Sequence, residues 1–508
     1  MRKVDCAYTF LNMDILSNYI QKLISDPFLI YFIAIFLILG LFRFFFDIFM
    51  KLIFGDSIDK SSDDFPGFQY DVALRKGNIG LGKSVTTFFL IATPVFYLTY
   101  VAVQGTPMQG FTMEWLNLIV RWIHVVAGIM WIGASFYFIF LENNLNRTKN
   151  VRPELAGNLW AIHGGGFYFL EKYKVAPKEI PQDLHWFKYE AYITWISGFA
   201  LLWVVYYMDP GGFLIDRSKA DISVSLAIFI GVGVLVVGWF VYDWMCKSPL
   251  INSGFWFTAI GLIFLTALSY FLVSFFNSRA AFIHVGAVMG TIMAANVFFI
   301  IIPSQKALVR AAISGEPLDA SLGKKAQQRS LHNNYLTLPV IFTMISNHFP
   351  STFGHELNWA LLMGIIIASA GIKHYWNLAE RGEKPRYLLP LSVSALVALA
   401  LITSPLTERS PEFDLSEPVS FHKVESIIHA RCATCHAEKP SDPIWTTAPG
   451  GVKFDTPEQM QTQANHIMRT TIRSNFMPLG NLTNMTDEER DIIHKWILQG
   501  ASIETESE

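Results

Sequence analysis

Long apolar runs between residues 28 and 404 are the feature that most constrains the fold of this chain. A helix needs about 20 consecutive, mostly apolar residues to cross the ~30 Å hydrocarbon core of a bilayer. Only 16% of the residues are charged, against about 25% in soluble domains. The runs predict an all-α fold, a polytopic transmembrane helix bundle. About ten spans are expected, near residues 28–50, 84–104, 113–141, 188–208, 222–246, 254–276, 280–302, 332–348, 357–374 and 386–404.

Lysine and arginine residues indicate which side of the membrane each loop occupies. They are concentrated in residues 142–187, in the loop after Pro303 and in residues 373–386. Cytoplasmic loops carry an excess of these residues, so we expect all three to be cytoplasmic. With ten spans, the chain after residue 404 then lies on the outer, periplasmic side of a bacterial inner membrane. The formal net charge of −2 provides no basic field of the kind that binds nucleic acid.

The chain changes character after residue 404. Residues 405–420 are rich in Pro, Ser and Glu and are expected to form a linker, and residues 421–508 resemble a small soluble domain. A domain of this size needs an added stabilising element. Its Cys432-Ala-Thr-Cys435-His436 motif is the attachment signature of a c-type haem. A zinc site would need more Cys or His ligands, and a redox Cys-x-x-Cys would lie in a βαβ pattern; the sequence offers neither context.

The same segment contains the expected axial ligands of the haem iron. His436 is placed to bind the iron from one side, and Met477, in a loop before Pro478, is the expected second ligand. Met485 is the rival, but it lies where Thr486 and Glu489 form a capping-box pattern that begins a helix. These features resemble a class I cytochrome c domain. Such haems are attached outside the cytoplasmic membrane, in agreement with the charge pattern.

Two histidines within the predicted spans raise the question of a second haem. His124 and His284 share the pattern Ile-His-Val-x-Ala, and small residues follow each of them. Polar residues inside a membrane are costly and usually have a function. We therefore expect either a b-type haem held by both histidines or a pair of hydrogen bonds between helices.

Three groups of polar and aromatic residues are expected on the cytoplasmic side. Amide, aromatic and cationic side chains together suit a planar, anionic heterocycle, whereas singly such residues anchor helices at the membrane interface. The first group is His163 with three glycines, the second is His185, Trp186, Lys188 and Glu190, and the third is Gln328, Arg329, His332, Asn333 and Asn334.

Five stretches together resemble the membrane-bound urate oxidase family, also called urate hydroxylase, whose members carry a C-terminal cytochrome c domain. They are "EWLNLIVRWIHVVAGIMWIGASFYFIFLENNL", "LWAIHGGGFYFLEKY", "LHWFKYEAYITWISGFALL", "HVGAVMGTIMAANVFFIIIP" and "QRSLHNNYLTLPVIFTMISNH". The resemblance covers residues 113–404, the expected membrane domain, and the haem domain after it. Residues 1–112, with two predicted spans, form an N-terminal extension without a counterpart.

The resemblance implies oxidation of urate to 5-hydroxyisourate, with water as the oxygen source and electrons leaving through the fused haem. A cytochrome c or a terminal oxidase would be the downstream acceptor. We expect His163, His332 or Glu190 to take a proton, and Arg329, Asn333, Trp186 and His185 to bind urate. The alternatives are a membrane-anchored electron conduit fed by quinol and a transporter with a fused cytochrome.

Overall fold

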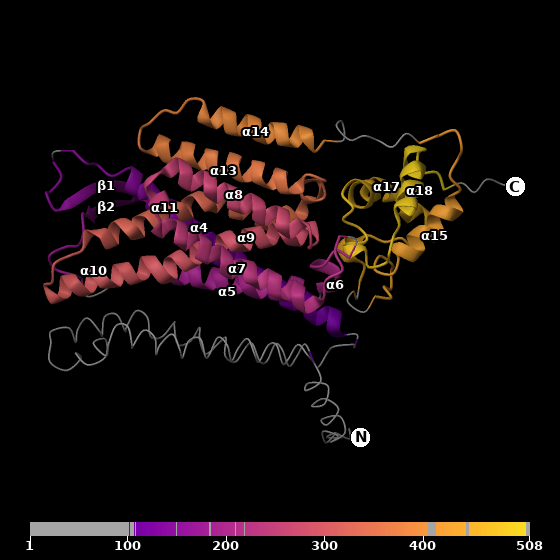
Figure 1. Ribbon diagram of the computed structural model, residues 1–508, viewed down its shortest axis with the longest axis horizontal. Coiled ribbons are helices and arrows are strands. Elements are labelled where there is room, and N and C mark those ends of the chain that lie inside the picture. Colours follow the sequence, from indigo (N-terminus) through magenta and orange to yellow (C-terminus); the bar gives the residue numbers. More distant parts are fainter. Residues whose placement is uncertain are drawn as a thin grey trace, which may run out of the picture. The chain divides into compact units, whose positions relative to one another are not determined.

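The structure is a computed structural model, and it describes residues 101, 106, 108–148, 150–181, 184–208, 210–217, 219–404, 413–442, 445 and 447–503. The predicted span 28–50, almost all of the span 84–104 and residues 405–412 of the predicted linker lie outside the described residues. The chain divides into two compact units, Met1–Thr112 with Pro181–His185, and Met113–Ile180 with Trp186–Glu508. The second unit contains nearly all described residues (Figure 1).

Residues 113–404 are mostly helical and are called the helical body here. Their elements in chain order are α4 (Met108–Asn143), β1 (Leu155–His163), β2 (Gly166–Tyr173), α5 (Tyr189–Leu202), η2 (Trp203–Tyr207), α6 (Pro210–Phe213), α7 (Val224–Lys247), η3 (Pro249–Asn252), α8 (Gly254–Val273), α9 (Ser278–Ala295), η4 (Asn296–Ile301), α10 (Ile302–Ser314), α11 (Ala320–Ile345), η5 (Ser346–His348), α12 (Pro350–Phe353), α13 (Asn358–Glu380) and α14 (Leu388–Ile402). Polar side chains begin several of them: Ser223 accepts a hydrogen bond from the N–H of Leu226 at the start of α7, and Asn277 does so from Arg279 at the start of α9.

Four helices of the described part are long and apolar enough to cross a membrane. They are α4, α7, α8 and the continuous helix Ser278–Ser314, which comprises α9, η4 and α10. The other predicted spans of the helical body coincide with α5 and η2, α11, α13 and α14, which are too short or too polar to qualify by length and composition alone. Four candidate spans are therefore present in the described part, and the total of ten stays a prediction.

Glycines allow the central helices to approach closely. A Cβ on Gly286 of α9 would lie 2.1 Å from Thr343 Oγ1 of α11, and one on Gly238 of α7 would lie 2.5 Å from Val288 Cγ1 of α9. Small residues at such crossings bring helix backbones together where no hydrophobic force acts between lipid-embedded helices. Contacts link α7 to α9, α9 to α11, α11 to α13 and α13 to α14, which run side by side in Figure 1.

A β-hairpin is the exception to the predicted all-α fold. The antiparallel strands β1 and β2 pair from Leu155–Tyr173 to His163–Gly166. Gly164 and Gly165 join them with φ angles of +59° and +79°, and tight two-residue turns of this kind favour glycine. Two of the three glycines grouped with His163 therefore form this turn, and the third, Gly166, begins β2.

The C-terminal segment, residues 413–503 of the described chain, has its own core. Its elements are α15 (Phe421–Arg431), η6 (Pro449–Gly451), α16 (Pro457–Thr462), α17 (Ala464–Ile467), η7 (Met468–Arg473), η8 (Leu479–Asn481) and α18 (Asp487–Leu498). Helices α15 and α18 pack together through Phe421 and Trp496, whose ring centroids are 6.0 Å apart. The buried core also includes Val424, Ile428 and Met460.

Candidate functional site

A buried arginine organises polar side chains where α7, η4 and α11 meet. Arg329 is only 2% exposed. Its Nη2 donates to Asp243 Oδ1 at 2.7 Å, and its Nη1 donates to Asn296 Oδ1 at 3.1 Å. Asn296 Nδ2 donates to Asn333 Oδ1 at 2.8 Å, and the Tyr242 ring centroid lies 5.0 Å from the guanidinium carbon. Asn296 also opens η4, a π-helical turn, and such turns are frequent at functional sites.

The polar groups around Arg329 are largely paired with one another. The Tyr242 hydroxyl and His332 Nδ1 are hydrogen-bonded at 2.8 Å, and Lys247 Nζ lies 2.6 Å from the second carboxylate oxygen of Asp243. A guanidinium neutralised by a carboxylate inside an apolar body holds its helices in register and retains little charge for a ligand. The Arg329 cluster, as we call it, comprises Arg329, Asp243, Asn296, Asn333, Tyr242 and His332.

The other residues predicted to handle substrate do not join the Arg329 cluster. His163 ends β1 and is exposed, as is His185. Trp186 packs beside Val297 and Ile302, next to the start of α5. Glu190 lies in the first turn of α5, and its Oε2 is buried without a hydrogen-bond partner among the described residues. The roles proposed for these side chains therefore stay predictions.

His284 is enclosed in a way that does not fit a b-type haem. It is fully buried, its Nδ1 donates to the carbonyl of Ala280 at 2.8 Å, and its Nε2 then accepts from the Tyr207 hydroxyl at 2.8 Å. A Cβ on Gly231 would lie 2.9 Å from that Nε2. Both ring nitrogens are occupied and the neighbouring helix fills the space that a macrocycle would need.

His124 is also held by hydrogen bonds to another helix. Its Nδ1 donates to the carbonyl of Thr194 at 3.0 Å and lies 3.1 Å from Ser197 Oγ, both on α5. Both histidines thus make a hydrogen bond to another helix, the alternative to a b-type haem, and the haem held by His124 and His284 stays a prediction.

The Cys-x-x-Cys-His motif directly follows α15, and its histidine is oriented for metal binding. His436 Nδ1 donates to the carbonyl of Val452 at 3.0 Å, so Nε2 keeps its lone pair. Burial lowers the pKa of His436, which favours the neutral imidazole that a metal needs. Burial also raises the pKa of Cys432 to about 12 and raises that of Cys435. No three His, Cys, Asp or Glu side chains of the described residues are grouped to hold a metal ion, so a zinc site is not supported.

The two candidate methionines lie in different surroundings. Met485 is 4% exposed and belongs to the core of the C-terminal segment, whereas Met477 is half-buried in a loop. The backbone of Met477 is fixed on both sides: its N–H donates to Thr470 at 2.9 Å, and its carbonyl accepts from Arg490 Nη1 at 2.8 Å. Two thiols, an imidazole with a bare Nε2 and a half-buried thioether outside the core fit a covalently attached haem, and Met477 is the methionine left available.

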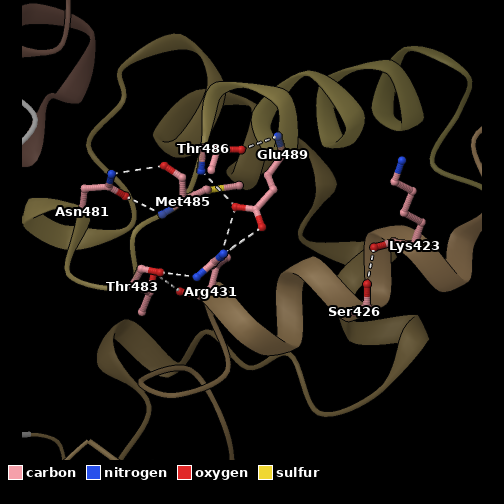
Figure 2. A network of polar contacts seen from close by, with 8 residues as sticks. All are labelled: Lys423, Ser426, Arg431, Asn481, Thr483, Met485, Thr486 and Glu489. Carbon is pink, nitrogen blue, oxygen red and sulfur yellow. Dashed lines mark hydrogen bonds and ion pairs between the residues drawn. The ribbon is translucent and has the colours of Figure 1, made fainter.

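A polar network holds the residue just before the motif (Figure 2). Arg431 binds the carboxylate of Glu489 in a forked arrangement with N–O distances of 2.9–3.1 Å, and it also donates to the carbonyl of Thr483. The capping box predicted for Thr486 and Glu489 is confirmed, because each side chain accepts from the backbone N–H of the other. Burial raises the pKa of Glu489, but the hydrogen bonds from Arg431 and from Thr486 and the nearby arginine charges outweigh it and lower that pKa.

Residues 110–404 match the family model described as urate oxidase N-terminal. The chain belongs to this family. The predicted resemblance is thus confirmed at family level, and it points to urate-related oxidoreductase chemistry. The urate oxidase match spans the helical body from α4 to α14 and does not include the C-terminal segment. Neither the curated proteins nor the solved structures contain a match.

Sequence reasoning missed Asp243, Asn296 and Tyr242 of the Arg329 cluster. A signal was present, because Asp243 interrupts the apolar run of α7 and Asn296 interrupts that of Ser278–Ser314. Ionisable or amide side chains inside such runs usually have a partner. What the pattern lacked was the pairing of α7 with α11, which are distant in sequence.

Proposed function

We propose that this member of the urate oxidase family is a membrane-bound enzyme that oxidises urate to 5-hydroxyisourate and delivers the electrons to a c-type haem on its C-terminal segment. The family match over residues 110–404 is the observation that supports urate as substrate. The four long apolar helices support a membrane location. The Cys432–His436 arrangement supports the haem.

The reaction balances as urate plus water giving 5-hydroxyisourate, two protons and two electrons. Cys432 and Cys435 would hold the haem covalently, and His436 Nε2 and the Met477 sulfur would bind its iron. When bound, a c-type haem accepts one electron at a time, so each urate needs two successive transfers. The Val452 carbonyl fixes the ring of His436, and Arg490 fixes the Met477 loop.

Further parts of the proposal concern location and partners. The basic loops support a bacterial inner membrane with the C-terminal segment on the periplasmic side. A soluble cytochrome c or a terminal oxidase would then take the electrons onward. The span total of ten belongs to the same proposal.

Anaerobic reduction of the haem by urate tests this function. Purified full-length protein should show a reduced c-type spectrum after urate is added, and 5-hydroxyisourate should form when an artificial acceptor is present. Reduction by quinol but not by urate would favour the electron conduit instead. Absence of covalently bound haem on a denaturing gel would remove the electron-transfer part of the proposal.

A further inference from the structure

A second group of polar and aromatic residues lies where the helical body contacts the C-terminal segment. Short helices α6 and α12 of the body contact η8 and η7 of the segment. Arg279, in the first turn of α9, lies over two rings here, 5.5 Å from the centroid of Phe213 and 5.9 Å from that of Phe476. Its guanidinium interacts electrostatically with that of Arg121 on α4. Two cations from separate helices therefore converge on this junction.

Neither cation is neutralised by a carboxylate. Within the described chain, Arg121 donates only to Asn117 Oδ1, at 2.9 and 3.1 Å, and Arg279 has no ion pair. Lys219 shows the contrast: it donates to Ser278, the residue before Arg279, and lies 3.4 Å from the carboxylate of Asp216. Two like charges that are half-buried and unpaired repel each other, and a bound anion would relieve this repulsion.

Unused hydrogen-bonding groups lie in the same place. Arg279 Nε and Asn347 Oδ1 are buried without hydrogen-bond partners among the described residues. Asn347 Nδ2 donates to the Tyr206 hydroxyl at 3.3 Å, and Tyr206 lies near Arg121. One free donor, one free acceptor and two phenylalanine faces match the edges and faces of a planar heterocycle that carries both N–H and C=O groups.

The junction lies close to Met477, the proposed iron ligand, which favours it as a site from which electrons reach the haem. Phe476 immediately precedes Met477, and its ring lies 5.3 Å from that of Phe353 on α12. Gly354 and Ser474 touch so closely that a Cβ on Gly354 would lie 2.2 Å from Ser474 Cβ. A substrate at this junction would lie beside the proposed iron ligand, so electrons would need no membrane haem to reach it.

We propose that this junction cluster, made of Arg121, Arg279, Tyr206, Asn347, Phe213 and Phe476, binds the urate monoanion. The inference rests on the proposed function and specifies where the substrate lies. Arg279 and Arg121 supply the positive charge, Asn347 accepts from a urate N–H, and the two phenylalanines stack against its faces. The Arg329 cluster, whose guanidinium already donates to Asp243 and Asn296, is not the substrate site.

Equilibrium dialysis of isotopically labelled urate against full-length, dithionite-reduced holoprotein tests this assignment, because a reduced haem cannot accept electrons and binding is measured without turnover. Arg279→Gln and Arg121→Gln should each weaken urate binding tenfold or more, because each removes one charge-assisted hydrogen bond to urate. Lys219→Gln, which removes a paired cation at the same end, should bind urate as the wild type does. Inorganic phosphate at equal concentration should not displace urate.

Unchanged urate affinity in both arginine variants would overturn the assignment, and so would an equal loss in Lys219→Gln or displacement by phosphate. An unchanged haem spectrum shows that a variant is folded, and Arg279→Lys gives a milder change that should restore part of the binding. If urate reduces the wild-type haem but both arginine variants keep the wild-type affinity for urate, only the junction site is contradicted. If urate neither reduces the haem of the wild-type protein nor binds to that protein, the proposed function itself is contradicted.

Discussion

The Arg329 cluster and the junction cluster both combine arginine, tyrosine and asparagine within the helical body, and they differ in how the charge is balanced. Arg329 has Asp243 at 2.7 Å and Asn296 at 3.1 Å. Arg121 and Arg279 have each other, two phenylalanine rings and no carboxylate within the described residues. A cation paired with a carboxylate in an apolar interior holds helices together, whereas unpaired cations favour the binding of an anion. Residue type alone therefore did not distinguish a structural from a binding arginine.

The largest effect is expected where the buried pair is broken. Arg329→Gln removes the buried partner of Asp243 and should lower the free energy of unfolding by about 3 kcal/mol, the low end for a broken buried pair, because Asp243 keeps its contact with Lys247. Detergent titration followed by circular dichroism measures this. Arg329→Gln with Asp243→Asn, which removes both charges, should recover most of the loss. Equal destabilisation by the single and double variants would contradict the view of the cluster as a structural pair.

An intermediate effect is expected for Arg431, which is paired but partly exposed. Arg431→Gln should destabilise the C-terminal segment by about 1.5–3 kcal/mol, since it removes charged hydrogen bonds to Glu489. The pKa of Glu489 is lowered in the folded state, so this stabilisation is present above its ordinary value of 4.5 and is lost as the pH falls through the folded pKa. Denaturation monitored at the haem band at pH 7 and at pH 3 should show the difference between wild type and variant shrinking in acid.

A smaller effect is expected from a methyl group placed at the junction. Gly354 has φ −82° and ψ −7°, which alanine also adopts, so Gly354→Ala adds only the clash with Ser474. It should raise the KM for urate-driven haem reduction about tenfold by displacing Phe476 and Met477 from the helical body. Gly290→Ala is the control, because no atom lies within 4 Å of the added carbon. Identical kinetics in the two variants would mean that the junction does not position the haem loop.

The smallest effect on stability is expected at Arg279. Because Arg279 has no carboxylate to leave behind, Arg279→Gln should change the free energy of unfolding by less than about 1 kcal/mol. Detergent titration of Arg279→Gln and Arg329→Gln side by side compares the free energy of unfolding that each cluster contributes. A loss as large as that of Arg329→Gln would show that Arg279 is structural after all.

Local patterns in the sequence predicted the mostly helical fold and several individual helices well. Apolar runs placed α7, α8 and α9, and the spacing of Thr486 and Glu489 predicted the start of α18, because these features depend on neighbours in the chain. The glycine turn after His163 could also have been predicted, but its glycines were grouped with His163 as part of a candidate ligand site. Positive φ at Gly164 and Gly165 shows that the turn was the stronger explanation.

The candidate sites were predicted less well, because they depend on pairing between distant helices. Arg329 and Asn333 were selected as substrate ligands, but nothing local showed that Asp243 and Asn296 would occupy them. Arg279 and Arg121 were overlooked because each looks like an ordinary cation near a helix end or within a span. Only the packed structure shows which arginine has a carboxylate and which does not.

The double role of Glu489 has a consequence for biosynthesis. The Glu489 carboxylate caps the start of α18 and also accepts hydrogen bonds from Arg431, the residue before the first attachment cysteine. A nascent chain that has emerged only as far as His436 cannot make this contact, since its partner is still unsynthesised. The attachment motif therefore acquires its full set of contacts only when the last helix has been made, and a chain truncated before Glu489 would keep only the hydrogen bonds between Arg431 and Thr483.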